Sequence, residues 1–71
     1  MRRSTLDVRL GRALRIGQQW RDRDDVIWRV RQVHRIDCDV VLVRAGLRRT
    51  VSFAHLRRDF VLIAHTLEEA A

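Results

Sequence analysis

Short strand-like segments, separated by polar turns, run through most of this sequence and limit what it can fold into. The longest is VIWRVRQVHRI, residues 26–36, which combines Val, Ile and Trp in an alternating pattern. The other four segments are GQQWR (17–21), VVLVRA (40–45), LRRTVSF (47–53) and FVLI (60–63). Alternating β-branched and aromatic residues between turn residues are typical of strands. We therefore expect a mainly β protein with five short strands.

The chain is short enough that this sheet must curl to cover its own apolar face. At 71 residues it provides one small core and no room for a second fold. AHLRRD, residues 54–59, predicts one helical turn before the last strand. A long bent second strand, hairpins at DCD and Gly46, and this helical turn resemble the layout of SH3-like small barrels, which include Tudor and KOW modules. The resemblance covers about Gly17 to Ile63 and implies a five-stranded SH3-like small barrel over residues 16–64.

The ends of the chain are expected to lie outside this barrel. Residues 1–15 form a basic N-terminal arm, and residues 65–71 form a polar tail. Three leucines at every fourth position favour a short amphipathic helix in the arm: Leu6, Leu10 and Leu14. Ser4 and Asp7 are spaced like a capping box, and Gly17 follows as a stop signal. The competing pattern is a strand, because Val8 alternates with leucines and Gly11 weakens a helix.

Side-chain alternation predicts which side of each strand is buried. Val26, Trp28, Val30 and Ile36 share one side of the second strand, which we expect to face the interior. A bulge near Gln32 is expected to bend this strand and bury Val33. The predicted core consists of Trp28, Val30, Val41, Val43, Val51, Phe53, Leu56, Val61 and Ile63.

Charge is the strongest indication of function. The chain has 15 basic and 9 acidic residues, a net charge of +6 and a pI of about 11.6. Such a balance favours a polyanionic partner. All the basic residues are arginine; the codon usage of a GC-rich genome explains this better than selection for recognition does.

The outward side of the second strand carries arginines that have like-charged neighbours across the sheet. Like charges on adjacent strands repel one another, and a bound anion would relieve that repulsion. Trp20, between polar residues, is predicted to offer a surface for base stacking at the barrel mouth. The predicted nucleic-acid-binding residues are Arg29, Arg31, Arg35, Arg48, Arg49, Trp20, Arg21 and Arg23. The alternative is that aspartates pair with these arginines and that Trp20 covers the small core.

The sequence contains no pattern typical of catalysis or metal binding. Its histidines and its lone cysteine lack the paired spacing of structural zinc sites: His34, Cys38, His55 and His65. No glycine-rich phosphate loop and no carboxylate dyad are visible. We therefore expect no enzyme, no catalytic residue, no metal and no cofactor. A single cysteine and the lack of a membrane-spanning apolar run favour a cytoplasmic protein without a membrane partner.

The resulting hypothesis is a small, non-enzymatic, nucleic-acid-binding accessory or regulatory protein from a bacterium, phage or plasmid. Arginine contacts to phosphate would dominate binding, to DNA or RNA, with weak sequence selectivity. The alternative is a protein-interaction module that docks an acidic partner, such as a polymerase or nuclease. A homodimer through the arm or an edge strand is a further alternative.

Overall fold

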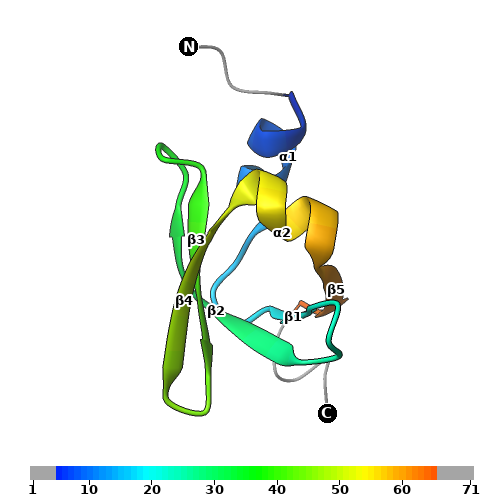
Figure 1. The fold of residues 1–71 in the computed structure, drawn as a ribbon. Helices are drawn as coiled ribbons and strands as arrows, with labels where there is room; N and C mark the ends of the chain where they lie inside the picture. Colours follow the sequence, from blue (N-terminus) through cyan, green and yellow to red (C-terminus); the bar gives the residue numbers. More distant parts are fainter. Residues whose placement is uncertain (1–4, 66–71) are drawn as a thin grey trace.

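Five strands and two short helices make up the protein in its computed structural model, which describes residues 5–65 (Figure 1). The predicted strands are all present, and the arm contains a helix. The elements are α1 (Thr5–Ala13), β1 (Gln19–Arg21), β2 (Ile27–His34), β3 (Asp39–Arg44), β4 (Leu47–Ser52), α2 (Phe53–Asp59) and β5 (Val61–Ala64). Ser4, half of the predicted capping box, lies outside the described range, as do tail residues 66–71.

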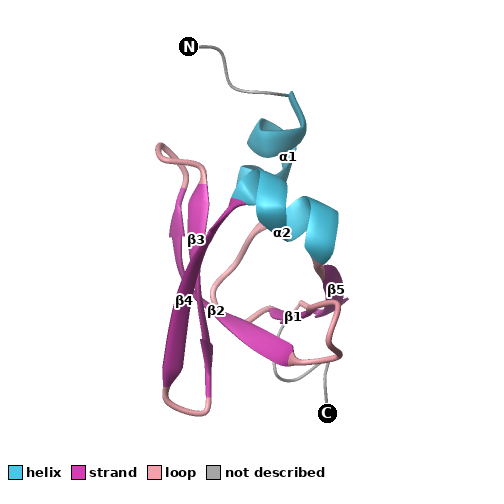
Figure 2. Ribbon diagram, in the orientation of Figure 1, coloured by secondary structure: helices cyan, strands magenta, loops and turns pink. Residues whose placement is uncertain are grey.

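The strands form one antiparallel sheet in the order β4-β3-β2-β1-β5 (Figure 2). β1 to β4 are neighbours in chain order, whereas β5 crosses over to pair with β1. The helix α2 makes this crossing, as predicted for residues 54–59. In the described part of the chain, the edge strands β4 and β5 do not pair with each other. The mainly β, five-stranded fold is thus confirmed, and the sheet is open between its two edges.

The long strand β2 bends at the predicted bulge. Val30 pairs with Leu42 and Gln32 pairs with Val41, so Arg31 is an extra residue without a partner in β3. An extra residue in one strand bends it and increases its twist. Val33, just past the bulge, packs against the core and is partly buried, as expected.

The core lies between the concave side of the sheet and the two helices. Its members are Leu14, Trp20, Trp28, Val30, Val40, Leu42, Val51, Phe53, Leu56 and Phe60. Phe53 and Leu56 of α2 belong to this core, Leu14 directly follows α1, and Leu10 of α1 packs against it. Figure 1 shows α1 and α2 together at one end of the sheet. Neither helix within residues 5–65 has the length and apolarity needed to cross a bilayer.

Several predicted core residues lie elsewhere. Val61 and Ile63 are 57% and 40% exposed. The side chain of Phe60 is buried at the end of α2, so the period of two turns its immediate neighbour Val61 outward. Ile36 was expected inside but is 82% exposed, because β2 ends at His34.

A second group of differences concerns β3. Val41 is buried but is not part of the core cluster, in which its neighbours Val40 and Leu42 take part. Val43, which shares the side of Val41, is only partly buried. The prediction therefore placed the inward side of β3 one residue out of phase.

The helix α1 packs closely against α2 because of Gly11. A Cβ atom at Gly11 would lie 3.0 Å from Cε2 of the Phe53 ring. The glycine, which weakens an isolated helix, therefore permits the close approach of α1 to the core. Leu14 is fully buried, Leu10 is partly buried and Leu6 is 53% exposed, so the leucine face is only partly used.

Candidate functional site

The structure divides the described arginines by what their side chains contact. Six form an ion pair or hydrogen bond within residues 5–65: Arg15, Arg21, Arg23, Arg35, Arg57 and Arg58. Arg49 stacks on aromatic rings. Within the same range, six guanidinium groups form no ion pair or hydrogen bond: those of Arg9, Arg12, Arg29, Arg31, Arg44 and Arg48. Only some of the predicted binding residues are therefore available to a partner.

Arg35 holds the end of helix α1. Its Nε donates to the carbonyl oxygen of Gly11 at 2.7 Å, and its Nη2 donates to that of Leu14 at 3.1 Å. Arginines commonly satisfy the last carbonyl groups of a helix in this way. Arg35 lies beyond the end of β2, so its inclusion in the outward row of that strand was wrong.

Arg49 lies on the inner side of β4. Its guanidinium carbon is 5.9 Å from the Trp28 ring centroid and 5.6 Å from that of Phe60. It shares its side of the strand with buried Val51. The cation therefore stacks over the edge of the core, away from the outward arginines, and its assignment to their row was wrong.

Trp20 is a core residue. Its side chain is only 7% exposed, and its Nε1–H points to Oε1 of buried Gln18 at 3.5 Å. The ring is therefore not presented for base stacking. The arginines beside it have acidic neighbours: Arg21 lies 3.7 Å from Asp25, and Arg23 lies 3.0 Å from Asp59. The ion pair of Arg21 is longer and therefore weaker than that of Arg23.

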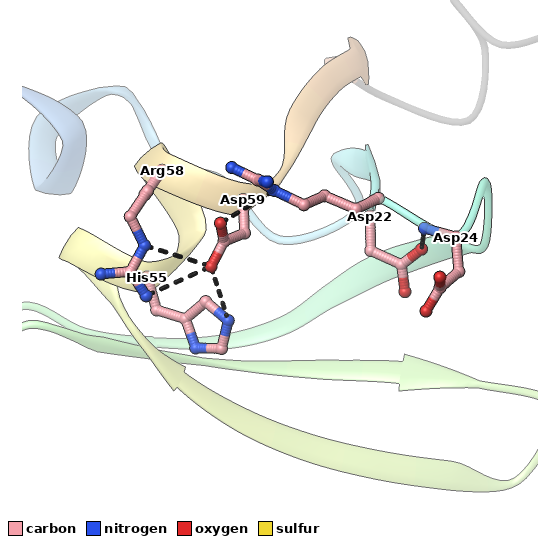
Figure 3. Close-up of polar contacts among 6 residues, drawn as sticks. Asp22, Asp24, His55, Arg58 and Asp59 are labelled. Carbon is pink, nitrogen blue, oxygen red and sulfur yellow. Dashed lines mark hydrogen bonds and ion pairs between the residues drawn. The ribbon is translucent and has the colours of Figure 1, made fainter.

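Asp59 is the centre of a polar cluster next to the β1–β2 loop (Figure 3). Its carboxylate contacts Arg58 and His55 at 3.2 Å and Arg23 at 3.0 Å. The hydrogen bond from Arg58, together with the neighbouring positive charges, lowers the pKa of the Asp59 carboxyl. Three basic side chains thus contact the same carboxylate, and this reduces their availability to an external anion.

Asp22 organises the β1–β2 loop. One oxygen accepts hydrogen bonds from the backbone N–H groups of Asp24 at 2.9 Å and Val26 at 3.0 Å. The other accepts from the indole Nε1–H of Trp28 at 3.0 Å. The bond from Trp28, followed by those from the backbone, lowers the pKa of the Asp22 carboxyl. This carboxylate therefore links the loop to the core.

We expect Asp22→Asn to destabilise the protein by about 1–3 kcal/mol at neutral pH, because both carboxylate oxygens accept hydrogen bonds and an amide has only one acceptor oxygen. Its NH2 group would therefore face either the Trp28 indole or the backbone N–H groups as donor against donor. A carboxyl whose pKa is lower in the folded state stabilises at neutral pH, and that contribution is lost as pH falls through the folded pKa. Urea unfolding at neutral and acidic pH measures both effects. The loss of stability on acidification should be smaller in the variant; an equal loss would contradict this role of Asp22.

Some of the arginines whose side chains form no ion pair or hydrogen bond within residues 5–65 lie on the outer side of the sheet. Arg29 pairs with Val43, and Val43 pairs with Arg48, so the two arginines flank one valine across three strands. Neighbouring strands lie about 4.8 Å apart, so the Cα atoms of Arg29 and Arg48 are separated by about 10 Å. On β2, Arg31 follows Arg29 and is exposed.

A hollow of about 470 Å³ adjoins this row, at the end where β3 turns into β4. Its lining residues are Gln19, Ile27, Arg29, Val43, Arg44, Ala45 and Gly46. Arg44 lines the hollow at its hairpin end, but it shares the side of buried Leu42 on β3 and so does not belong to the outward row. We call Arg29, Arg31 and Arg48 the arginine face.

Guanidinium groups without a local acid are suited to binding oxyanions through charge-assisted hydrogen bonds. Among residues 5–65, no group of three or more His, Cys, Asp or Glu side chains is arranged to hold a metal ion. Comparisons with protein-family models, curated proteins and solved structures gave no match to the chain. The function must therefore be inferred from these residues themselves.

Proposed function

We propose that the protein is a small, non-enzymatic nucleic-acid-binding accessory or regulatory protein, and that the arginine face contacts the phosphate backbone. The observation that carries the proposal is the position of Arg29 and Arg48. They lie on the same side of the sheet, flank Val43, and form no ion pair within residues 5–65. Membership of the SH3-like small barrels is part of the proposal, supported by the bent β2 and by α2 between β4 and β5.

The mode of binding follows from the chemistry of the face. Planar guanidinium forks match phosphate oxygens in two-point contacts. The net charge of +6 adds a long-range attraction for a polyanion. Contacts to phosphate position a protein on nucleic acid without reading its sequence, so we expect weak sequence selectivity.

A fluorescence anisotropy titration tests this function. Labelled DNA and RNA should bind with micromolar or tighter affinity at about 50 mM salt, and affinity should fall steeply as salt is raised. Three phosphate contacts to a duplex predict a slope of about −2.7 in the logarithmic salt plot, or a loss of roughly 40-fold between about 50 and 200 mM. No binding at the lower salt concentration would contradict the proposal.

A second candidate function is docking of an acidic protein. The observation that favours it is an apolar strip beside Arg21, across the strands β2, β1 and β5. Arg21 pairs with Ile27 on one side and with Val61 on the other, and these two side chains are 46% and 57% exposed. An apolar strip next to a cation suits a protein surface. A pull-down whose captured protein stays bound at high salt would favour this function over nucleic-acid binding.

A further inference from the structure

Every tryptophan and phenylalanine ring of the chain is buried. The sequence has two tryptophans, two phenylalanines and no tyrosine, and all four rings lie within the described residues. Their exposed fractions are 7% for Trp20, 8% for Trp28, 1% for Phe53 and 5% for Phe60. Arg49, an exposed arginine, stacks on two of these rings, those of Trp28 and Phe60. The surface therefore has no Trp, Tyr or Phe ring on which a base could stack, and its exposed rings are the smaller imidazoles of His34 and His65.

The absence of exposed Trp, Tyr and Phe rings indicates which form of nucleic acid the arginine face can bind. Proteins that bind single strands without sequence preference gain about 1–3 kcal/mol per base by stacking bases on aromatic side chains. A flexible single strand must also be ordered when it binds, which costs free energy. A duplex is already ordered and carries one negative charge per about 1.7 Å of its axis. Phosphate contacts alone therefore favour a duplex.

The spacing of the arginines on this face matches the two rows of phosphates along a nucleic-acid duplex. Arg29 and Arg48 are separated across the strands, by about 10 Å at their Cα atoms. Arg31 lies two residues further along β2 than Arg29, at the bulge. The face thus extends in two directions. A duplex presents two phosphate rows separated by a groove of about 6 or 12 Å, distances that long arginine side chains can bridge from such a base.

Resting on the proposed function, we infer that the ligand of the arginine face is double-stranded nucleic acid, gripped by the phosphate rows on both sides of a groove. The bases are neither stacked on the protein nor splayed out. Binding leaves the two tryptophans in their core environment.

The experiment titrates the full chain with four labelled probes of equal nucleotide number: duplex DNA, duplex RNA, oligo-dT and oligo-U. Salt is held at about 50 mM, where phosphate contacts are strong. Anisotropy and intrinsic tryptophan emission are recorded together. We expect at least one duplex to bind about tenfold or more tightly than both single strands, with tryptophan emission unchanged at saturation. The preferred duplex then identifies the natural class as DNA or RNA.

Other outcomes separate the inference from the function beneath it. Single strands that bind as tightly as the duplexes, or tryptophan emission that is quenched on binding, would overturn the duplex inference and leave the proposed function standing. Failure of all four probes to bind would overturn both. The variant Arg29→Ala/Arg48→Ala, titrated in parallel, should lose binding to the preferred duplex; retained affinity would show that the duplex binds another surface.

Discussion

Replacing Arg29 and Arg48 together with alanine is expected to weaken nucleic-acid binding by about 100-fold or more at low salt, because each lost charge-assisted contact costs about 1.5–3 kcal/mol. The salt slope should become shallower by about 1.8, or 0.9 for each lost phosphate contact. Both side chains are exposed and neither forms an ion pair within residues 5–65, so the fold should be unaffected. Anisotropy at several salt concentrations, with circular dichroism for the fold, measures these quantities.

The matched control is Arg9→Ala/Arg12→Ala. It removes the same charge from exposed, similarly uncommitted arginines, but from α1 and not from the sheet. Alanine is a good helix former, so α1 should be retained. If the face is the binding surface, this control weakens binding far less than the sheet variant. Equal losses from the two variants would mean that total charge decides binding and that the arginine face is no defined site.

The elements of the fold were predictable because their signals are local. Alternation in residues 26–36, the hairpin residue Gly46 and the helical turn at 54–59 each depend on a few neighbouring side chains. The bulge in β2 was predictable because a long strand must bend to enclose a small core. The inward side of β5 was not predictable from the sequence, because it depends on where α2 ends and on whether Phe60 is buried. A shift of one residue there reverses the whole strand.

The composition of the site was less predictable than the fold. Whether an arginine is available depends on partners that are distant in sequence. Arg35 is occupied by carbonyl groups more than twenty positions earlier, at Gly11 and Leu14, and Arg57 pairs with Asp7. Strand alternation predicted that Arg29 and Arg48 lie on the outer side of the sheet, and the register of the strands agrees. It could not show that the side chain of Arg35 binds carbonyl groups at the end of α1.

Trp28→Ala is expected to bring the protein close to unfolding at room temperature. The ring is 8% exposed and packs in the core, its N–H donates to Asp22, and its face carries the guanidinium of Arg49. Truncation of a buried Trp costs about 3–5 kcal/mol. A chain of this length has a total stability of only about 4–10 kcal/mol. Urea unfolding followed by far-ultraviolet circular dichroism measures the loss, with the remaining Trp20 as a fluorescent probe.

Trp28→Phe separates the packing of the ring from its hydrogen bond. Phenylalanine keeps an aromatic face for Arg49 and fills much of the space, but it leaves the Asp22 oxygen without its indole donor. This variant should therefore be more stable than Trp28→Ala and should lose part of the effect that lowers the Asp22 pKa. If Trp28→Ala unfolds at the same urea concentration as the parent, the ring does not belong to the core. The inward side of β2, and with it the outward position of Arg29, would then be wrong, because one alternation sets both.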